Sequence, residues 1–240
     1  MRNTAAPRRL RTPHVRPWST SWLVYRALGQ ALAAGVAQAR SRLGLRRGLA
    51  LDVGCGHRPW RDLLVDMDCL ALDATTVDAS PQVVADAAAL PVADARADLV
   101  FCSQVLEHVE DAGRVLLEFS RVLRDGGQLV LSVPFYWPLH EEPFDYRRFT
   151  SHGLRLELAR AGFDDIDIEA DCATLTVVVV ASFGLLPDRR LPRLPWLPLV
   201  LLANLLAPWA QRLSADRRST LNWVVRATRQ ARLTAPAPER

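Results

Sequence analysis

Two glycines and two acids form the part of the sequence best suited to holding a nucleotide-like cofactor. The apolar run Leu49–Val53 contains Asp52 and leads into Gly54-Cys55-Gly56, and Asp73 closes the next apolar run. Glycine has no Cβ, so the backbone of such a loop can approach a ligand closely. A carboxylate about 20 residues further on can accept hydrogen bonds from ribose hydroxyls. The pattern predicts a cofactor loop, although two glycines alone also fit an ordinary turn.

A second group of reactive side chains follows in the segment 134–150. It contains His140, three carboxylates and two arginines among aromatic residues. A histidine beside carboxylates can exchange protons with a substrate, and arginines can clamp an anion. We expect this segment to lie at the mouth of the cofactor site.

The elements that must position these residues alternate between short apolar strands and helices. We expect strands at 48–53, 69–73, 83–85, 99–103, 128–133 and 166–170, helices at 60–65, 111–123 and 151–161, and a turn at 125–127. This alternation predicts an α/β fold with a mostly parallel sheet and helices on both faces. Asp52, Asp73, Asp86 and Ser103 stand at the carboxyl ends of strands, where such sheets bind their ligands.

Further apolar elements flank this core. A helix is expected through about Arg42, capped by Ser19, Thr20 or Ser21. The strongly apolar runs 174–186 and 194–210 are separated by a basic turn at 188–190 and followed by a final strand at about 219–228. A spanning helix needs about 20 apolar residues, and the second run is shorter and carries three prolines. A lid over the site, an element dipping into one leaflet, and a helix packed on the core remain open interpretations.

We therefore expect three parts. A basic flexible arm covers residues 1–18, a single domain covers 19–230, and a disordered tail covers 231–240. Within the domain, the core spans 48–170 and the apolar insertion or lid spans 172–213.

Charge is unevenly distributed along the chain. Residues 1–51 carry ten Arg and no acid, residues 52–171 carry 23 acids and ten Arg, and residues 172–240 carry ten Arg and three acids. The net charges of the three segments are therefore +10, −13 and +7. Basic ends suggest an anionic partner, first of all a phospholipid surface. Nucleic acid is not favoured, because basic and aromatic residues do not interleave as they do in RNA-binding modules. The exclusive use of Arg, with no Lys, fits codon bias equally well.

The four cysteines do not suggest a metal site. They lie far apart, without C-x-x-C pairs or matching histidine spacing, so we expect no metal and read them as small thiols in a reducing compartment. The N-terminus lacks the continuous apolar segment of a secretory signal. We expect a cytoplasmic protein, peripheral on the inner membrane face if the basic ends meet lipid.

Taken together, the motifs resemble those of class I S-adenosylmethionine-dependent methyltransferases of the type 11-like group. The matching stretches are 51–56 (LDVGCG), 71–73 (ALD), 84–87 (VADA) with 90–91 (LP), 103–109 (SQVLEHV) and 121–127 (RVLRDGG). Their order and spacing resemble the family over about residues 48–170. The resemblance implies a Rossmann-like methyltransferase sheet whose last strand is antiparallel, and S-adenosyl-L-methionine as the cofactor.

The resemblance also implies roles for individual residues. The loop 54–56 would pass under the methionine and ribose of the cofactor, Asp73 would take the ribose hydroxyls, and Asp86 with the Ala87 amide would read the adenine edge. Asp52 would orient the loop or meet the methionine amine, and Ser103 and Gln104 would line the methionine side. The implied cofactor-binding residues are Asp52, Gly54, Cys55, Gly56, Asp73, Asp86, Ala87, Ser103 and Gln104.

The segment 134–150 resembles a loop of enzymes that tailor glycans, lipids or secondary metabolites. We expect at least one of four residues to contact the methyl acceptor: His140, Glu141, Asp145 and Tyr146. For a hydroxyl acceptor, His140 is the first candidate base, oriented by Glu141 or Asp145, and His108 is the alternative. A carboxylate acceptor needs no base, and Arg147 or Arg148 would then act as a clamp. A purely structural loop, in which Arg147 or Arg148 pairs with Asp145, is also open.

The expected activity is methyl transfer to oxygen of a small-molecule, glycan or lipid-linked acceptor. A scaffold or partner protein that binds the cofactor without chemistry is one alternative. A nicotinamide-dependent oxidoreductase is another, but its loop requires a third glycine, and residues 57–60 read His-Arg-Pro-Trp. Oligomeric state is left open.

Overall fold

The computed structural model describes residues 15–44, 47–76, 81–183, 196–213 and 216–231. The strands are β1 (Leu49–Val53), β2 (Asp68–Asp73), β3 (Val83–Val84), β4 (Ala97–Ser103), β5 (Leu123–Pro134), β6 (Phe163–Ala170) and β7 (Asn222–Arg229). The helices are α1 (Trp22–Leu43), α2 (Ala112–Val122), α3 (Ser151–Arg160), α4 (Thr174–Phe183) and α5 (Leu197–Leu213), with short 3₁₀ helices η1 (Arg61–Leu64) and η2 (Leu106–His108).

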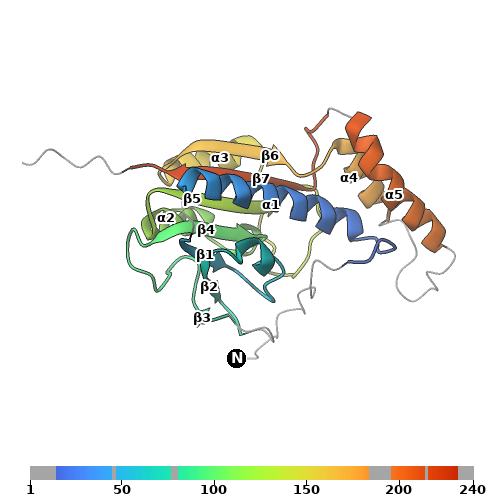
Figure 1. Ribbon diagram of the computed structural model, residues 1–240. Coiled ribbons are helices and arrows are strands. Elements are labelled where there is room, and N and C mark those ends of the chain that lie inside the picture. The colour runs from blue at the N-terminus through green and yellow to red at the C-terminus, as the bar shows by residue number, and fades with distance from the viewer. Residues whose placement is uncertain (1–14, 45–46, 77–80, 184–195, 214–215, 232–240) are drawn as a thin grey trace, which may run out of the picture.

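One seven-stranded sheet with the order β3-β2-β1-β4-β5-β7-β6 organises the molecule. The first five strands pair in parallel, whereas β7 runs antiparallel to both β5 and β6. Helices cover both faces, and α4 and α5 stand together beyond one end of the sheet (Figure 1). The predicted fold class is confirmed: a mostly parallel sheet with an antiparallel last strand, an N-terminal helix and an apolar helical insertion before that strand.

The apolar core is divided by the sheet. On one face, Leu28, Leu32 and Val36 of α1 join a cluster with Val130 and Val224 of the sheet. A larger cluster includes the buried side chains of α2 and α3 on the opposite face. This packing places α1 across the sheet, with its first turns near the carboxyl ends of β1 and β4 (Figure 1).

Two local predictions need correction. Ser21 stands at the N-cap of α1, but no side-chain cap hydrogen bond forms there; instead the Ser21 amide donates to Ser19 Oγ at 3.2 Å. The expected turn at 125–127 falls within the bounds of β5, Leu123–Pro134, where the pairing with β4 jumps from Leu123 to Gln128. Gly126 has a φ of 72°, so the chain bulges out of the ladder between these two pairs.

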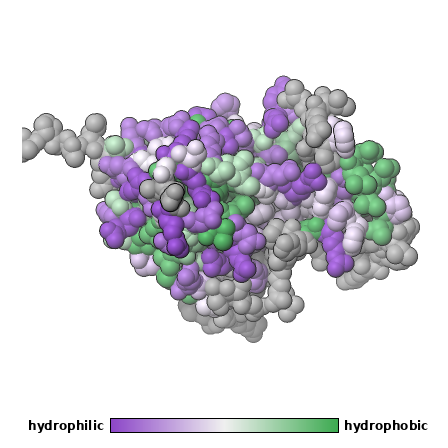
Figure 2. All heavy atoms as spheres, in the orientation of Figure 1, coloured by the Kyte–Doolittle hydropathy of each residue, from purple (hydrophilic) through white to green (hydrophobic). Residues whose placement is uncertain are grey.

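The apolar insertion forms two helices. The surface over α5 is strongly hydrophobic (Figure 2). Among the described residues, no helix is both long and apolar enough to cross a membrane. The basic turn at 188–190, most of the arm (1–14) and most of the tail (232–240) lie outside the described residues. All four cysteines are free thiols, three of them buried.

Candidate active site

The glycine loop after β1 has a shape that only glycine fits. Gly54 has a φ of 69°, and a Cβ at this position would lie 2.2 Å from Cγ2 of Val105. The amides of Gly54 and Cys55 both donate to the carbonyl of Leu72, at 2.9 and 3.1 Å. The loop therefore turns tightly across the end of β2 and exposes its backbone.

Asp73, at the end of β2, ties this loop down. Its Oδ2 accepts a 2.7 Å hydrogen bond from the Gly56 amide, and its Oδ1 accepts from the amide and hydroxyl of Thr75 at 3.0 and 3.1 Å. The carboxylate is buried. Asp73 therefore fixes the position of Gly56, whether or not it also contacts a ligand.

Asp52 lies buried below the loop, inside β1. Burial raises the pKa of its carboxyl to about 6, while Arg58, whose Nε lies 3.9 Å from Oδ2, lowers it and Asp73 raises it further. The side chain does not line the cavity described below. The geometry fits a supporting position under the loop.

The carboxyl end of β4 is held by Ser132 of β5. Ser103 Oγ lies 2.9 Å from Ser132 Oγ, and Gln104 Nε2 donates to the same oxygen at 3.1 Å. The Gln104 amide donates to the Ser132 carbonyl at 3.0 Å, with the residue at a φ of 58°. A left-handed, non-glycine residue fixed by two hydrogen bonds is a local strain of the kind that functional sites often carry.

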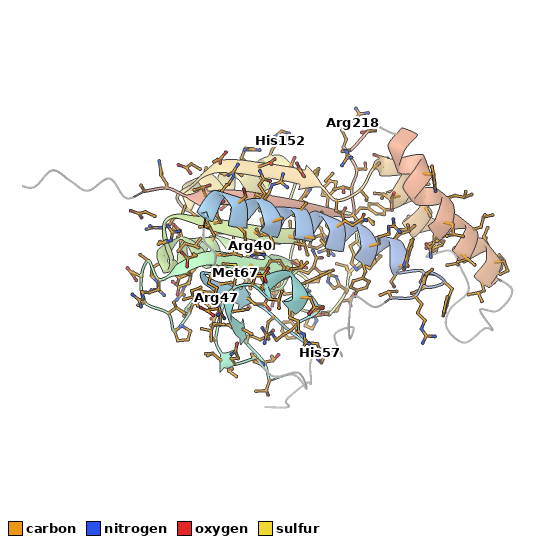
Figure 3. The ribbon with its side chains drawn as sticks, in the orientation of Figure 1. Arg40, Arg47, His57, Met67, His152 and Arg218 are labelled. Atoms are coloured by element: carbon orange, nitrogen blue, oxygen red, sulfur yellow. The ribbon has the colours of Figure 1, made fainter. Side chains whose placement is uncertain are left out.

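One cavity of about 400 Å³ brings the two predicted groups together. Its wall includes seven of the predicted site residues: Gly54, Cys55, Gly56, Ser103, Gln104, His140 and Glu141. His57 also lines it, at the end of the sheet where α1 begins (Figure 3). The glycine loop 54–56 and the histidine of segment 134–150 therefore face the same space.

The other predicted site residues do not line this cavity. Asp86 is exposed and accepts a 2.8 Å hydrogen bond from the Ala88 amide, while Ala87 beside it is buried. Tyr146 is exposed, and its amide donates to the carbonyl of Glu107 at 2.9 Å. The structure thus does not bring Tyr146 to His140 and Glu141 in the cavity wall.

Asp145 stands behind His140 and fixes it. Arg148 donates to both Asp145 oxygens, and the His140 amide donates to Oδ2 at 3.1 Å. The Arg148 hydrogen bonds hold the pKa of the Asp145 carboxyl down at about 2, so it is ionised at neutral pH. His140 Nδ1 lies 3.1 Å from Oδ2, although not aligned as a hydrogen bond. An ionised carboxylate here can orient the imidazole and stabilise its protonated form.

His108 sits beside His140, with the rings edge to face and 4.8 Å between centroids. Its Nδ1 lies 2.9 Å from the Phe144 carbonyl oxygen. A carbonyl only accepts, so Nδ1 carries the proton, and Nε2 points toward Glu107 (3.7 Å) and Glu141 (4.0 Å). His108 lines the cavity, which the role of alternative base requires.

Glu107 is a site feature that the sequence did not reveal. Its side chain is completely buried, and neither carboxyl oxygen has a hydrogen-bond partner in the described part of the chain. Burial raises the pKa of this carboxyl to about 8. Glu107 belongs to the matching stretch 103–109, next to His108, but a motif does not show which of its side chains turns inward.

Three of these side chains are also placed to hold a cation. Glu107, His108 and His140 each offer one ligand atom, and these atoms all lie within 4.8 Å of one another. Two imidazoles and a carboxylate suit a divalent transition metal. The prediction that the protein needs no metal therefore stays a prediction.

The structure adds wall residues from elements remote in sequence. They come from the first turns of α1, from the loop after β5 and from β7: Ser21, Val24, Tyr25, Leu28, Trp137 and Asn222. Burial raises the pKa of the Tyr25 phenol. The sequence predicted the helix α1, but its placement over the cofactor loop depends on long-range packing that periodicity does not report.

Comparisons with known proteins agree with this geometry. A family model described as a methyltransferase domain matches residues 51–131. The malonyl-[acyl-carrier protein] O-methyltransferase of Methylococcus capsulatus is 35% identical over 171 residues, which are 60% of this chain and 61% of the relative. A probable S-adenosylmethionine-dependent methyltransferase of Mycobacterium tuberculosis is 32% identical over 136 residues, covering 48% of each chain.

Solved structures show the same fold. The crystal structure of an S-adenosylmethionine-dependent methyltransferase from Archaeoglobus fulgidus aligns with a TM-score of 0.54 and 16% identity, covering 84% of this chain and 94% of that one. The chain spans between about half and three fifths of the length of the two curated relatives above. The part matched by the family model includes the glycine loop 54–56 and the cavity residues Ser103 and Gln104.

Proposed function

We propose that this chain, which belongs to the class I S-adenosylmethionine-dependent methyltransferases, transfers a methyl group to a hydroxyl oxygen of a small-molecule, glycan or lipid-linked acceptor. One observation carries the proposal: the glycine loop and His140 line a single cavity. A cofactor on the loop and an acceptor beside the histidine would share that space. Holding two reactants in line can supply most of the acceleration of a displacement reaction.

The cofactor of this family is S-adenosyl-L-methionine, and the loop residues fit it. Gly54 packs against Val105, where a Cβ would collide, and its backbone lines the cavity. We assign the ribose hydroxyls to Asp73 and the adenine edge to Asp86 with the Ala87 amide. Ser103 and Gln104 would line the methionine part, and Asp52 would support the loop from below.

The bound cofactor supplies a methyl group activated by a positively charged sulfur. The chain's own residues then have three tasks. The wall from Tyr25, Leu28 and Trp137 excludes water, the loop 54–56 aligns the donor, and His140 removes the proton of the acceptor hydroxyl. Asp145, ionised and fixed by Arg148, holds His140 and stabilises the imidazolium that forms.

A hydroxyl is the acceptor group that the site supports best. A carboxylate acceptor would call on Arg147 or Arg148 as a clamp, but Arg148 is bound to Asp145 and Arg147 donates to the Glu110 carbonyl at 2.6 Å. Neither arginine lines the cavity. The name of the M. capsulatus relative specifies O-methyl transfer to a malonyl group, whose free oxygen is a carboxylate, so it supports oxygen as the acceptor atom and leaves the choice of a hydroxyl to the site geometry.

An anionic membrane surface is the partner we propose beside the acceptor. The basic ends of the chain, with net charges of +10 over 1–51 and +7 over 172–240, support it. The same ends do not support nucleic acid as a partner, because their aromatic and basic residues do not interleave.

The test compares two histidines. Metabolites that gain a methyl mass when the chain is expressed would identify an acceptor, and turnover would then be measured with purified protein. His140→Ala should lower turnover about 100-fold or more, while affinity for S-adenosylhomocysteine stays within about twofold of wild type, below roughly half a kcal/mol. His152→Ala is the control, because His152 is exposed on α3, away from the cavity (Figure 3).

Two results would contradict the proposal. Full turnover by His140→Ala would transfer the role of base to His108. Cofactor binding without methyl transfer to any metabolite would identify a catalytically silent scaffold.

A further inference from the structure

The outward side of α5 is a continuous hydrophobic surface. Its five residues, here called the leucine face, are 53% to 68% exposed: Leu199, Leu202, Leu205, Leu206 and Trp209. Val200, Asn204 and Ala207 on the other side of the helix are buried. Figure 2 shows this hydrophobic region at the end of the molecule formed by α5. Monomeric proteins rarely expose so many large apolar side chains together, and such patches mark docking sites.

The chemistry of this face fits lipid better than protein. Neither α4 nor α5 contains an acid or a lysine. The leucine face presents hydrocarbon and one indole, whereas protein interfaces carry about one hydrogen bond per 100–200 Å². The acyl region of a bilayer forms no hydrogen bonds with a protein, and a helix that lies in the interface buries its apolar face there.

Aromatic and basic residues flank α5. Trp196 directly precedes the helix, and Trp18 lies next to it, because Asn204 Nδ2 donates to the carbonyls of Pro17 and Ser19 at 2.6 and 2.9 Å. Arg16 stacks on Trp18, with its guanidinium carbon 5.3 Å from the ring centroid. The Arg218 side chain, beyond the other end of α5, is 91% exposed and pairs with Asp216, with Nε 3.1 Å from Oδ1 (Figure 3). Tryptophan suits the headgroup region, and arginine suits anionic headgroups.

A second cavity lies beside the first one, along α4. It has a volume of about 540 Å³ and is lined by Val180, Ala181 and Phe183 of α4 and by the aromatic segment 135–138. Ser21 and Trp137 belong to the walls of both cavities. An acyl chain could therefore lie between α4 and segment 135–138 while its polar end reaches His140.

We infer that the leucine face of α5 docks the protein on an anionic phospholipid bilayer, and that the acceptor is a membrane lipid whose hydrocarbon chain occupies the second cavity. The acceptor part rests on the proposed methyl transfer to a hydroxyl. The docking part does not, because none of the leucine-face residues lines the cofactor cavity.

The first experiment measures docking of the full chain by vesicle flotation. The vesicles contain either phosphatidylcholine alone or phosphatidylcholine with phosphatidylglycerol. The chain should float with the anionic vesicles, less with the neutral ones, and L202E/L206E should lose at least about tenfold in partitioning. The matched control is L117E/L156E, which changes two leucines of similar exposure, 56% and 50%, on α2 and α3; it should float like wild type.

Several outcomes would overturn docking. They are no flotation of wild type on anionic vesicles, equal losses in the two double variants, and a leucine-dependent dimer that does not bind vesicles. Affinity for S-adenosylhomocysteine is measured on the same samples. L202E/L206E should keep it unchanged, so failure to dock and failure to bind the cofactor are separate results.

The second experiment tests whether the second cavity binds an acyl chain. The probe is dansyl-undecanoic acid, a fluorescent single-chain amphiphile. It is titrated into L202E/L206E, so that the leucine face does not compete for the probe. Adding Val180→Trp to this variant should weaken probe binding several-fold, because the indole would fill the space beside Trp137. Equal affinity with and without Val180→Trp, or no binding at all, would contradict an acyl site in the second cavity.

Discussion

The glycine loop 54–56 lines the first cavity and α4 of the apolar insertion lines the second, but the two regions are held in opposite ways. Around the loop, the amides of Gly54, Cys55 and Gly56 are each bound to β2, at Leu72 or Asp73. The insertion is anchored through a few polar contacts, such as Asn204 to the carbonyls of 17 and 19, and turns its leucines outward. A site built from backbone geometry tolerates few residue types, whereas an apolar surface tolerates many.

The largest expected effect breaks the loop. Gly54→Ala places a Cβ 2.2 Å from Val105 at a φ of 69°, and we expect it to cost about 3 kcal/mol of folding free energy. Gly44→Ala is the control. Gly44 has a φ of 62° but no atom within 4 Å of the added Cβ, so only the backbone cost of about 1 kcal/mol should remain. Chemical denaturation measures both, and equal losses would contradict the steric account.

The next effect concerns the buried carboxyl under the site. The pKa of Glu107 is about 8 in the folded chain, above its ordinary value of 4.5. The folded state therefore holds a proton that the unfolded state has released between these two pH values. Stability should fall as pH rises from about 5 to about 9, by on the order of 3 kcal/mol.

Glu107→Gln should remove most of this pH dependence. The variant should match wild type near pH 5 and exceed it in thermal stability near pH 9. Thermal unfolding across that range is the measurement. Parallel curves for wild type and variant would show that the Glu107 carboxylate is ionised and paired in the folded protein.

A smaller effect is expected in the insertion. Asn204 is fully buried, and Asn204→Ala would leave the carbonyls of Pro17 and Ser19 without their donor, at a cost of about 2 kcal/mol. Hydrogen exchange along α5 should speed up, while affinity for S-adenosylhomocysteine stays unchanged. Leu205→Ala, at an exposed position of the same helix, should leave exchange as it is. A loss of cofactor affinity in Asn204→Ala would mean that the two regions are coupled.

No effect at all is expected from chelation. The proposed methyl transfer needs no metal ion, because His140 would remove the acceptor proton and the charged sulfur of the cofactor activates the methyl group. Removing metal ions with EDTA should therefore change neither cofactor affinity nor turnover. Loss of activity that zinc or manganese restores would assign Glu107, His108 and His140 to a metal site.

The two regions also differ in how far the sequence predicted them. The strands ending at Val53, Asp73 and Ser103 follow from local apolar runs. The Gly54–Gly56 loop follows from a motif whose glycine at position 54 the backbone requires. The turn expected at 125–127 lies within the bounds of β5, as a bulge between the paired residues Leu123 and Gln128. The meeting of Tyr25, Asn222 and the loop in one wall was not predictable, since contacts between residues so far apart in sequence arise from tertiary packing.

For segment 134–150, residue types alone left the roles open. Arg148 pairs with Asp145, as the interpretation of the segment as a structural loop requires. His140 nevertheless lines the cavity. Tyr146 turns away from it. Which side chain of a loop faces inward depends on contacts such as the hydrogen bond from the Tyr146 amide to the Glu107 carbonyl. No periodic pattern encodes such a contact.

Calorimetric titration with S-adenosylhomocysteine tests the central claim most directly. Wild type should bind, Asp73→Ala should bind about tenfold to 100-fold more weakly through loss of its charge-assisted hydrogen bonds, and Asp62→Ala, whose side chain is 85% exposed on η1, should bind like wild type. A folded wild-type sample that binds neither S-adenosylhomocysteine nor S-adenosylmethionine would contradict the assignment of the loop 54–56 as a cofactor site.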